Sequence, residues 1–148
     1  MSALAYRTET TICRPPEDVF DYCSDLRSEL QWNPKVKYVE KLTDGPVGVG
    51  TRYRAQWSNS GPTTVEVVQF DRPRRWKTHA KARAMGIRFQ GTVTDAASGA
   101  RYTADLELLP RGLAWLVAPL ALLIMRWQDH KNMSRIREAL ESSTVRSE

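Results

Sequence analysis

Four polar side chains fall among apolar residues on one face of predicted strands and are therefore placed for chemistry: Tyr53, Gln69, Thr78 and Tyr102. Successive residues of a strand point to opposite faces of a sheet, so each shares a face with the apolar residues two positions away. A few polar groups in an apolar pocket usually orient a carbonyl or hydroxyl group of a ligand. A tyrosine whose ring packs in a core while its hydroxyl reaches water gives the same pattern. Tyr53 or Tyr102 would be the proton donor if the protein were an enzyme.

The sequence offers no other arrangement for catalysis. His79 alternates onto the opposite strand face, and His130 follows Asp129 in a predicted helix, where adjacent side chains do not face each other. No Ser-His-Asp or paired-carboxylate pattern occurs, and two exposed histidines do not make a metal site. Cys13 and Cys23 lack CxxC spacing, so we predict two free, buried thiols, with a disulfide as the alternative. We therefore predict no catalytic residue, no metal and no cofactor.

The elements that position these residues are predicted from hydrophobic alternation. Strands are indicated at 6–12, 36–42, 51–58, 63–70, 74–82, 87–94 and 101–109. The connections between the last five are short and rich in turn-forming residues, which predicts an antiparallel meander.

Two short helices are predicted between the first and second strands. Pro16 suits the first helical position, and Glu17 and Asp18 suit the first turn, where the helix dipole favours negative charge. A second helix is expected to begin at Asp25. It must end near Pro34, because proline pushes the residue before it out of helical geometry.

A long C-terminal helix is predicted from an apolar run at 113–125 and the amphipathic segment that follows it. A helix that is apolar all round is buried on several sides or faces something other than water. The run is shorter than the roughly 20 residues that span a bilayer, and it contains Pro119. We interpret Trp115, Val117, Leu120, Ile124 and Trp127 as the wall of a cavity or as part of the core. The alternative is that one side is exposed for dimerisation or membrane contact.

The two faces of the predicted sheet differ in charge. The face that carries Tyr53 and Trp76 has no charged residue, whereas the other carries many lysines and arginines, and the net charge of the chain is +5. We interpret the basic face as a solvated surface, with contact to an anionic membrane or an acidic partner as the alternative. Nucleic acid is not expected to bind, because the aromatic residues lie on the other face.

Four stretches carry a resemblance to a known family: 15–20 (PPEDVF), 32–34 (WNP), 49–53 (VGTRY) and 111–120 (RGLAWLVAPL). They resemble the START-like or SRPBCC superfamily, and specifically its bacterial polyketide cyclase/dehydrase-like branch. The resemblance implies an α+β helix-grip fold, in which a seven-stranded curved antiparallel sheet grips a long C-terminal helix. It also implies an apolar pocket between the sheet and that helix. Because the superfamily includes both lipid carriers and cyclases, the fold does not settle the activity.

We therefore predict one ligand-binding domain over 1–148, with 142–148 as a frayed tail, located in the cytoplasm. Its expected function is to bind or transport a small hydrophobic molecule that is lipid-like, polyketide or aromatic. The alternatives are a polyketide aromatase/cyclase or dehydratase, and a peripheral membrane or partner-binding module that uses the basic sheet face. The sequence leaves open a monomer or a homodimer. The predicted ligand contacts are Trp32, Tyr53, Trp57, Gln69, Trp76, Thr78, Phe89, Tyr102, Leu106, Trp115, Leu120 and Ile124.

Overall fold

A computed structural model describes residues 4–58 and 60–146 of the chain, with side chains described up to residue 142. Strands form where the sequence alternates, and the first and last helices begin shortly after Pro15 and Gly112. The elements are β1 (Ala5–Ile12), α1 (Pro16–Ser24), the 3-10 helix η1 (Leu26–Ser28), α2 (Glu29–Trp32), β2 (Val36–Lys41), β3 (Arg52–Trp57), β4 (Thr63–Asp71), β5 (Arg75–Lys81), β6 (Met85–Ala96), β7 (Gly99–Pro110) and α3 (Ala114–Arg146).

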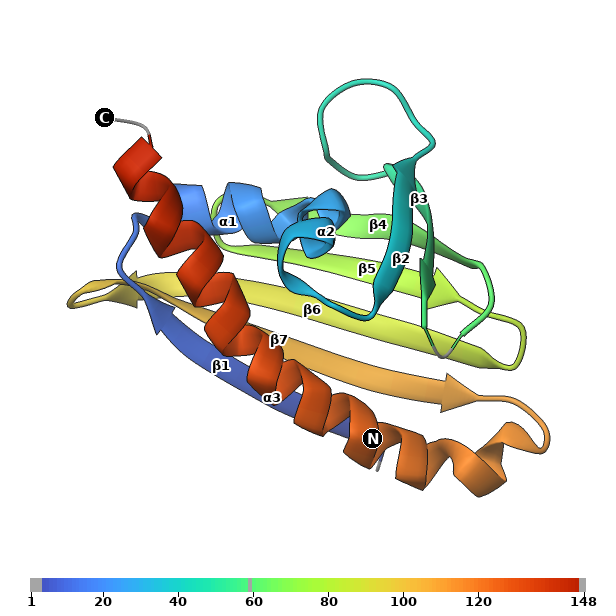
Figure 1. Cartoon of the computed structure of the whole chain (residues 1–148). Coiled ribbons are helices and arrows are strands. Elements are labelled where there is room, and N and C mark those ends of the chain that lie inside the picture. Colours follow the sequence, from blue (N-terminus) through green and yellow to red (C-terminus); the bar gives the residue numbers. More distant parts are fainter. Residues whose placement is uncertain (1–3, 59, 147–148) are drawn as a thin grey trace.

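The strands form a seven-stranded antiparallel sheet in the order β1-β7-β6-β5-β4-β3-β2. Strands β2 to β7 follow each other as a meander, and β1 adds to β7 so that the first and second strands occupy opposite edges. The sheet curves, and α3 runs along it on the side of β1, while α1 and α2 cover another part of the same face (Figure 1). This arrangement confirms the predicted helix-grip fold.

The short helices begin where the sequence predicts. Pro16 is the first residue of α1, and Val19 and Phe20 are its buried residues against the sheet, together with Ser24. Asp25 then caps η1 by accepting a hydrogen bond from the backbone N–H of Arg27. These turns place α2, with Glu29 at its start, over the inner face of the sheet.

The long helix α3 is buried along one stripe only. Ala118, Met133, Ile136 and Leu140 are buried, and their spacing brings them to one side of the helix. Pro119 lies inside the helix without ending it. The helix continues to Arg146, so most of the segment predicted as a tail is helical, and residues 147 and 148 lie outside the described residues.

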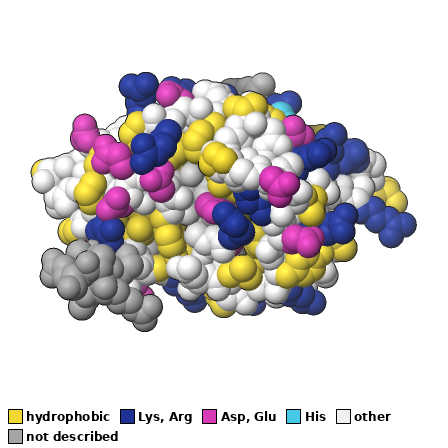
Figure 2. All heavy atoms as spheres, turned by 90° about the horizontal axis from the view of Figure 1, so that it is seen from above, with side chains coloured by type: hydrophobic (Ala, Val, Ile, Leu, Met, Phe, Trp, Pro, Cys, Tyr) yellow, Lys and Arg dark blue, Asp and Glu magenta, His cyan; other side chains and the backbone are white. Residues whose placement is uncertain are grey.

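The outer face of the sheet agrees with the prediction of a solvated, basic surface. Arg52, Arg54, His79 and Arg88 are exposed on the outer face of the sheet, as predicted. Seen from above, the molecule carries basic, acidic and apolar side chains mixed together (Figure 2). None of the described helices is long and apolar enough to cross a bilayer.

Both cysteines are free thiols, as predicted, but only one lies away from the surface. Cys23 is partly buried, and its burial raises its pKa well above the usual value for a thiol. Cys13 is exposed, which corrects the prediction of two buried thiols. The reason is that Cys13 follows the last residue of β1, beyond the strand whose alternate residues are covered.

Candidate functional site

Trp76 of β5 is the centre of an aromatic cluster on the inner face of the sheet. Its ring is stacked on Tyr102 with centroids 5.9 Å apart, and meets Phe20 of α1 edge-on at 5.2 Å. Phe20 also contacts Phe70 edge-on at 5.1 Å. Trp76 and Tyr102 are buried, so this end of the inner face is filled by protein side chains.

A glycine makes room for this tryptophan. Gly91 lies opposite Trp76 in the ladder between β5 and β6, and a Cβ atom there would approach the Trp76 ring to 2.2 Å. The small residues that the sequence places beside large ones therefore serve tight packing here, not empty space.

The inner face becomes more accessible away from this cluster. Trp32, Trp57, Thr78 and Phe89, all predicted ligand contacts, are only partly buried. Phe89 packs against both the cluster around Trp76 and a second cluster beneath the first half of α3. The partly buried residues therefore occupy the inner surface between the two clusters and beside α2.

Glu29 brings a carboxyl group to this partly buried region. Its Oε1 accepts a hydrogen bond from Nε1 of Trp57 at 3.1 Å and another from Nδ2 of Asn33 at 2.8 Å. Burial raises the pKa of Glu29 to about 7, and the charge of Asp129 acts in the same direction, against the two hydrogen bonds. The carboxyl thus titrates near neutral pH while part of the residue surface stays accessible.

Asp129 is a second carboxyl group that α3 turns toward the interior. It accepts a short hydrogen bond from the hydroxyl of Tyr6. Burial raises its pKa above the usual value, although hydrogen bonds from Tyr6 and Asn132 oppose the shift. Burial, with the neighbouring Asp129, likewise raises the pKa of Tyr6 far above its usual range, so its hydroxyl stays protonated and donates.

Tyr53 is tied to a third carboxyl group. Its hydroxyl lies 3.3 Å from Oδ1 of Asp25, whose carboxylate also accepts hydrogen bonds from the backbone and guanidinium groups of Arg27. Burial alone would raise the pKa of Asp25, but the bonds from Arg27 outweigh it and the pKa is lowered. Burial raises the pKa of Tyr53, so its hydroxyl is protonated at neutral pH. This hydroxyl already donates its hydrogen bond to Asp25.

Gln69 does not lie on the inner face of the sheet, where it was predicted. A β-bulge between Val67 and Gln69 places Gln69 opposite Lys77 and Phe70 opposite Trp76. Directly paired residues of an antiparallel ladder share a face, so Gln69 lies on the outer face and Phe70 takes its place inside. Gln69 is therefore not an inner-face ligand contact.

The first half of α3 does not form the predicted wall of a cavity. Trp115, Leu120 and Ile124 are 59%, 63% and 45% exposed, so they are not a buried wall. The helix contacts the second core cluster through Ala118, Leu122 and Met125 instead. Leu120 follows Ala118 by two residues, about 200° round the helix, and therefore points away from the sheet.

The remaining predicted contacts fall into two groups. Tyr53, Trp76, Tyr102 and Leu106 are buried on the inner face, and Trp32, Trp57, Thr78 and Phe89 are partly buried there. We retain the second group as the predicted ligand contacts, since they keep accessible surface.

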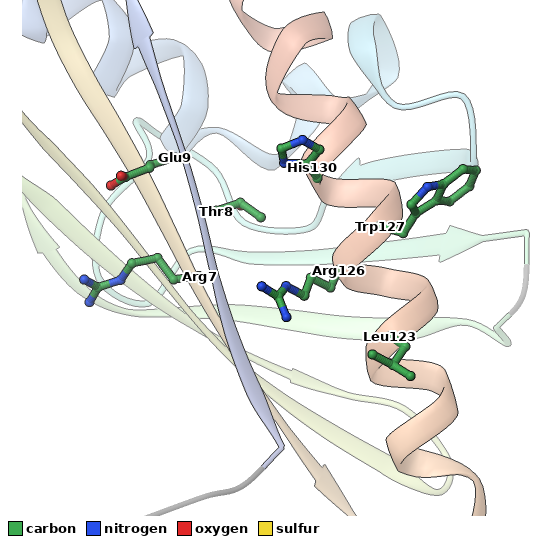
Figure 3. Close-up of a pocket in the computed structure, with 7 residues that line it drawn as sticks. All are labelled: Arg7, Thr8, Glu9, Leu123, Arg126, Trp127 and His130. Carbon is green, nitrogen blue, oxygen red and sulfur yellow. The ribbon is translucent and has the colours of Figure 1, made fainter.

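Two grooves open at the surface near β1. One, of about 760 Å³, is lined mostly by residues of the outer face, such as Lys77, His79 and Arg88. Its lining also includes the predicted ligand contacts Thr78, Phe89 and Leu106 of the inner face. The other, of about 460 Å³, lies between β1 and α3 and includes Thr8, Arg126 and His130 (Figure 3). The second groove reaches the edge of the inner face, since Thr8 pairs with Ala104 of that face. Neither groove includes Glu29, Trp32 or Trp57, so the ligand position beside α2 stays a prediction.

The sequence analysis missed Glu29 and Asp129. A signal for Asp129 was present: it precedes Met133, Ile136 and Leu140 at helical spacing, on the stripe that becomes buried. Glu29 carried no comparable signal, because its burial depends on β3 bringing Trp57 across to α2. Within the described residues, no group of three histidine, cysteine or acidic side chains could hold a metal ion.

The sequence pattern of one family matches residues 4–146 of this chain; the family is described as polyketide cyclase / dehydrase and lipid transport. The chain belongs to this family. The match covers every element from β1 to α3, and it confirms the START-like, polyketide cyclase-like resemblance. No curated protein matches the chain.

Solved structures show the fold of this polyketide cyclase/dehydrase-like chain in other organisms. The protein TTHA0849 from Thermus thermophilus is similar with a TM-score of 0.75 and 18% identity, over 94% of this chain and 98% of that one. The protein of unknown function SA2116 from Staphylococcus aureus gives 0.73 and 13%, over 95% of each chain. A START superfamily protein from Mycobacterium smegmatis gives 0.71 and 15%, over 91% and 98%. Membership of the family supports binding of a hydrophobic ligand or a polyketide cyclase role.

Proposed function

We propose that this chain binds a small, mainly apolar, uncharged molecule on the inner face of the sheet, between α2 and α3, and carries it unchanged. The observation that carries the proposal is Glu29, whose carboxyl is desolvated enough to titrate near pH 7 while the residue keeps accessible surface. A group in this state lies where water is scarce but a guest molecule can still reach it.

The surroundings of Glu29 define the chemistry of the guest. The partly buried rings of Trp32, Trp57 and Phe89 offer apolar contact area. Glu29 and Asp129 are acceptors when ionised, so a hydroxyl group on the ligand would be recognised and an anionic ligand would be repelled. A neutral, largely apolar molecule with a hydroxyl group fits both properties.

Titration with the neutral fluorescent probe N-phenyl-1-naphthylamine tests the proposal. The substitution Thr78→Phe should fill the inner surface and weaken probe binding at least tenfold. The matched control Thr94→Phe adds the same ring to an exposed position on β6 and should leave binding unchanged. Equal affinities for both variants, or no binding by the unmodified protein together with no ligand retained in native mass spectrometry, would reject the proposal.

A polyketide cyclase or dehydratase activity is the second candidate, favoured by the same carboxyl group. A general acid–base works best with a pKa near the operating pH, and Glu29 has a pKa of about 7. Turnover of a poly-β-keto thioester by the unmodified protein, lost on Glu29→Gln, would establish the activity. Rates unchanged in Glu29→Gln, and in Tyr53→Phe and Tyr102→Phe, would remove all three residues from any catalytic role.

A further inference from the structure

The outward face of the first half of α3 is an apolar stripe that no described part of the chain covers. Its members are spaced alternately three and four residues apart, which keeps them on one side of the helix. Single exposed apolar residues are common, but a contiguous set marks an interaction surface. The stripe consists of Leu113 (83% exposed), which directly precedes α3, and of Leu116 (79%), Leu120 (63%), Leu123 (62%) and Trp127 (59%) within the helix.

The charges around this stripe are positive. Arg126 is the only charged residue between 112 and 128, and Arg111 precedes the helix. Beyond the stripe, the ammonium group of Lys131 lies 3.9 Å from the ring centroid of Trp127. The exposed tryptophans Trp115 and Trp127 lie near the two ends of the apolar segment. Apolar residues flanked by cations and tryptophans are typical of helices that lie in a membrane interface.

The groove between β1 and α3 lies directly beside the stripe. Arg126 points from α3 toward β1, with His130 above it, and Thr8 points from β1 toward the helix (Figure 3). The Thr8 hydroxyl is buried and has no hydrogen-bond partner, and Arg126 forms no hydrogen bond or ion pair with another described residue. Glu9 also borders the groove but points to the far side of β1. Within the described residues, the groove thus presents a guanidinium group without a partner, and the buried Thr8 hydroxyl beside it also lacks one.

We propose that the apolar stripe of α3 docks on the surface of an anionic phospholipid membrane and that the adjacent groove takes a lipid phosphate group. Consecutive helical residues are about 100° apart, so Arg126 lies to the side of the stripe residue Trp127. When the stripe faces the acyl chains, Arg126 and the groove lie at the level of the headgroups. The stripe spans about 20 Å along the helix, enough for a stable surface contact.

A second copy of the chain fits the same stripe less well. Pairing two stripes would bring Arg111 and Arg126 of both copies to one seam. Helices that pair through such a spacing usually place opposite charges beside the seam, and residues 112–128 contain no acidic residue. An anionic membrane supplies the missing negative charge. This docking needs no ligand inside the protein and is therefore independent of the proposed function.

Co-sedimentation with vesicles tests the apolar stripe. Unmodified protein should bind phosphatidylcholine vesicles that contain one-third phosphatidylglycerol and should bind pure phosphatidylcholine weakly. The double substitution Leu116→Glu with Leu120→Glu should reduce binding at least tenfold. The matched control Leu42→Glu with Val49→Glu removes two other exposed apolar side chains and adds the same charge, and it should bind more tightly than the stripe variant by several-fold. Circular dichroism verifies that both variants are folded.

Three results would overturn this membrane inference. Absence of binding by the unmodified protein would do so, and so would equal losses in the two double variants. The third is a dimer of the unmodified protein in sedimentation equilibrium that the stripe variant dissociates, because the stripe would then be occupied by a second copy.

A second pair of variants tests whether the groove between β1 and α3 takes a lipid phosphate group. Arg126→Gln should weaken binding to the anionic vesicles about five-fold more than Arg54→Gln, which removes the same charge from the outer sheet face. Equal effects of the two substitutions would overturn the assignment of the groove, because they would show that only net charge matters.

Discussion

The indole N–H of Trp57 donates a hydrogen bond to Oε1 of Glu29 over 3.1 Å, which joins strand β3 to helix α2 at the inner surface. The bond stabilises the ionised carboxylate, whereas burial favours the protonated acid. The balance between them sets a pKa of about 7, and this makes Glu29 the titratable group on which the proposed interior site rests.

Removal of the indole donor should shift this balance. In Trp57→Phe, the pKa of Glu29 is expected to rise above 7, because a hydrogen bond that lowers it is lost. Carbon-13 NMR titration of the glutamate carboxyl signals measures the shift. Trp32→Phe is the matched control, since Nε1 of Trp32 lies 3.4 Å from Ser28 Oγ and does not bond Glu29. An unchanged Glu29 titration in Trp57→Phe would contradict the role given to this bond.

The stability of the protein should fall as pH rises through the titration of Glu29. The pKa of Glu29 is about 7 in the folded chain against a usual 4.5. Between these pH values the folded chain therefore keeps a proton on Glu29 that the unfolded chain has lost. The free energy of unfolding should therefore decrease from about pH 4.5 to pH 7, by about 2 kcal/mol once partial exposure is allowed for. Urea unfolding across this range measures it.

Glu29→Gln should flatten that pH dependence, while Glu40→Gln, at an exposed position of β2, should not. Burial also raises the pKa of Asp129, so its titration lowers stability in the same direction. Asp129→Asn should therefore remove a further part of the pH dependence of stability. A stability profile that keeps its full slope in Glu29→Gln would show that the carboxyl is not buried.

Loss of the Tyr6 hydroxyl should destabilise the protein more at high pH than at low pH. Asp129 accepts the hydrogen bond of Tyr6, and an ionised buried carboxylate needs its donors more than a protonated one does. Tyr6→Phe should cost about 1–3 kcal/mol at a pH where Asp129 is ionised and less at a pH where it is protonated. In the Asp129→Asn background the pH dependence of this cost should disappear, which a double-mutant cycle by urea unfolding would measure.

Gly91 should tolerate no side chain, because Trp76 occupies the space in which its Cβ would lie. Gly91→Ala is expected to destabilise the protein by about 2–4 kcal/mol through overpacking. Gly48→Ala, where nothing lies within 4 Å of the added atom, is the control and should change stability little. If thermal unfolding shows that both variants keep the stability of the unmodified protein, the position of the Trp76 ring against Gly91 is wrong.

The fold could be predicted from the sequence because the strands alternate and the turns carry their own signals. The position of Gln69 could not, since one bulge residue in β4 reverses the faces of the residues after it. The exposed side of α3 was predicted only as an alternative to a cavity wall. Hydrophobicity on all sides of a helix cannot indicate which side is covered, and the sheet covers only the stripe through Ala118, Leu122 and Met125.

Chemical-shift mapping with N-phenyl-1-naphthylamine tests the interior site most directly, through the indole signals of Trp32 and Trp57 and the amide signals of Thr78 and Phe89. We predict that these four signals move in a saturable way, while those of Leu116 and Leu120 on the outward face of α3 stay in place. Shifts confined to α3, or no saturable shift at the four inner positions, would contradict the account.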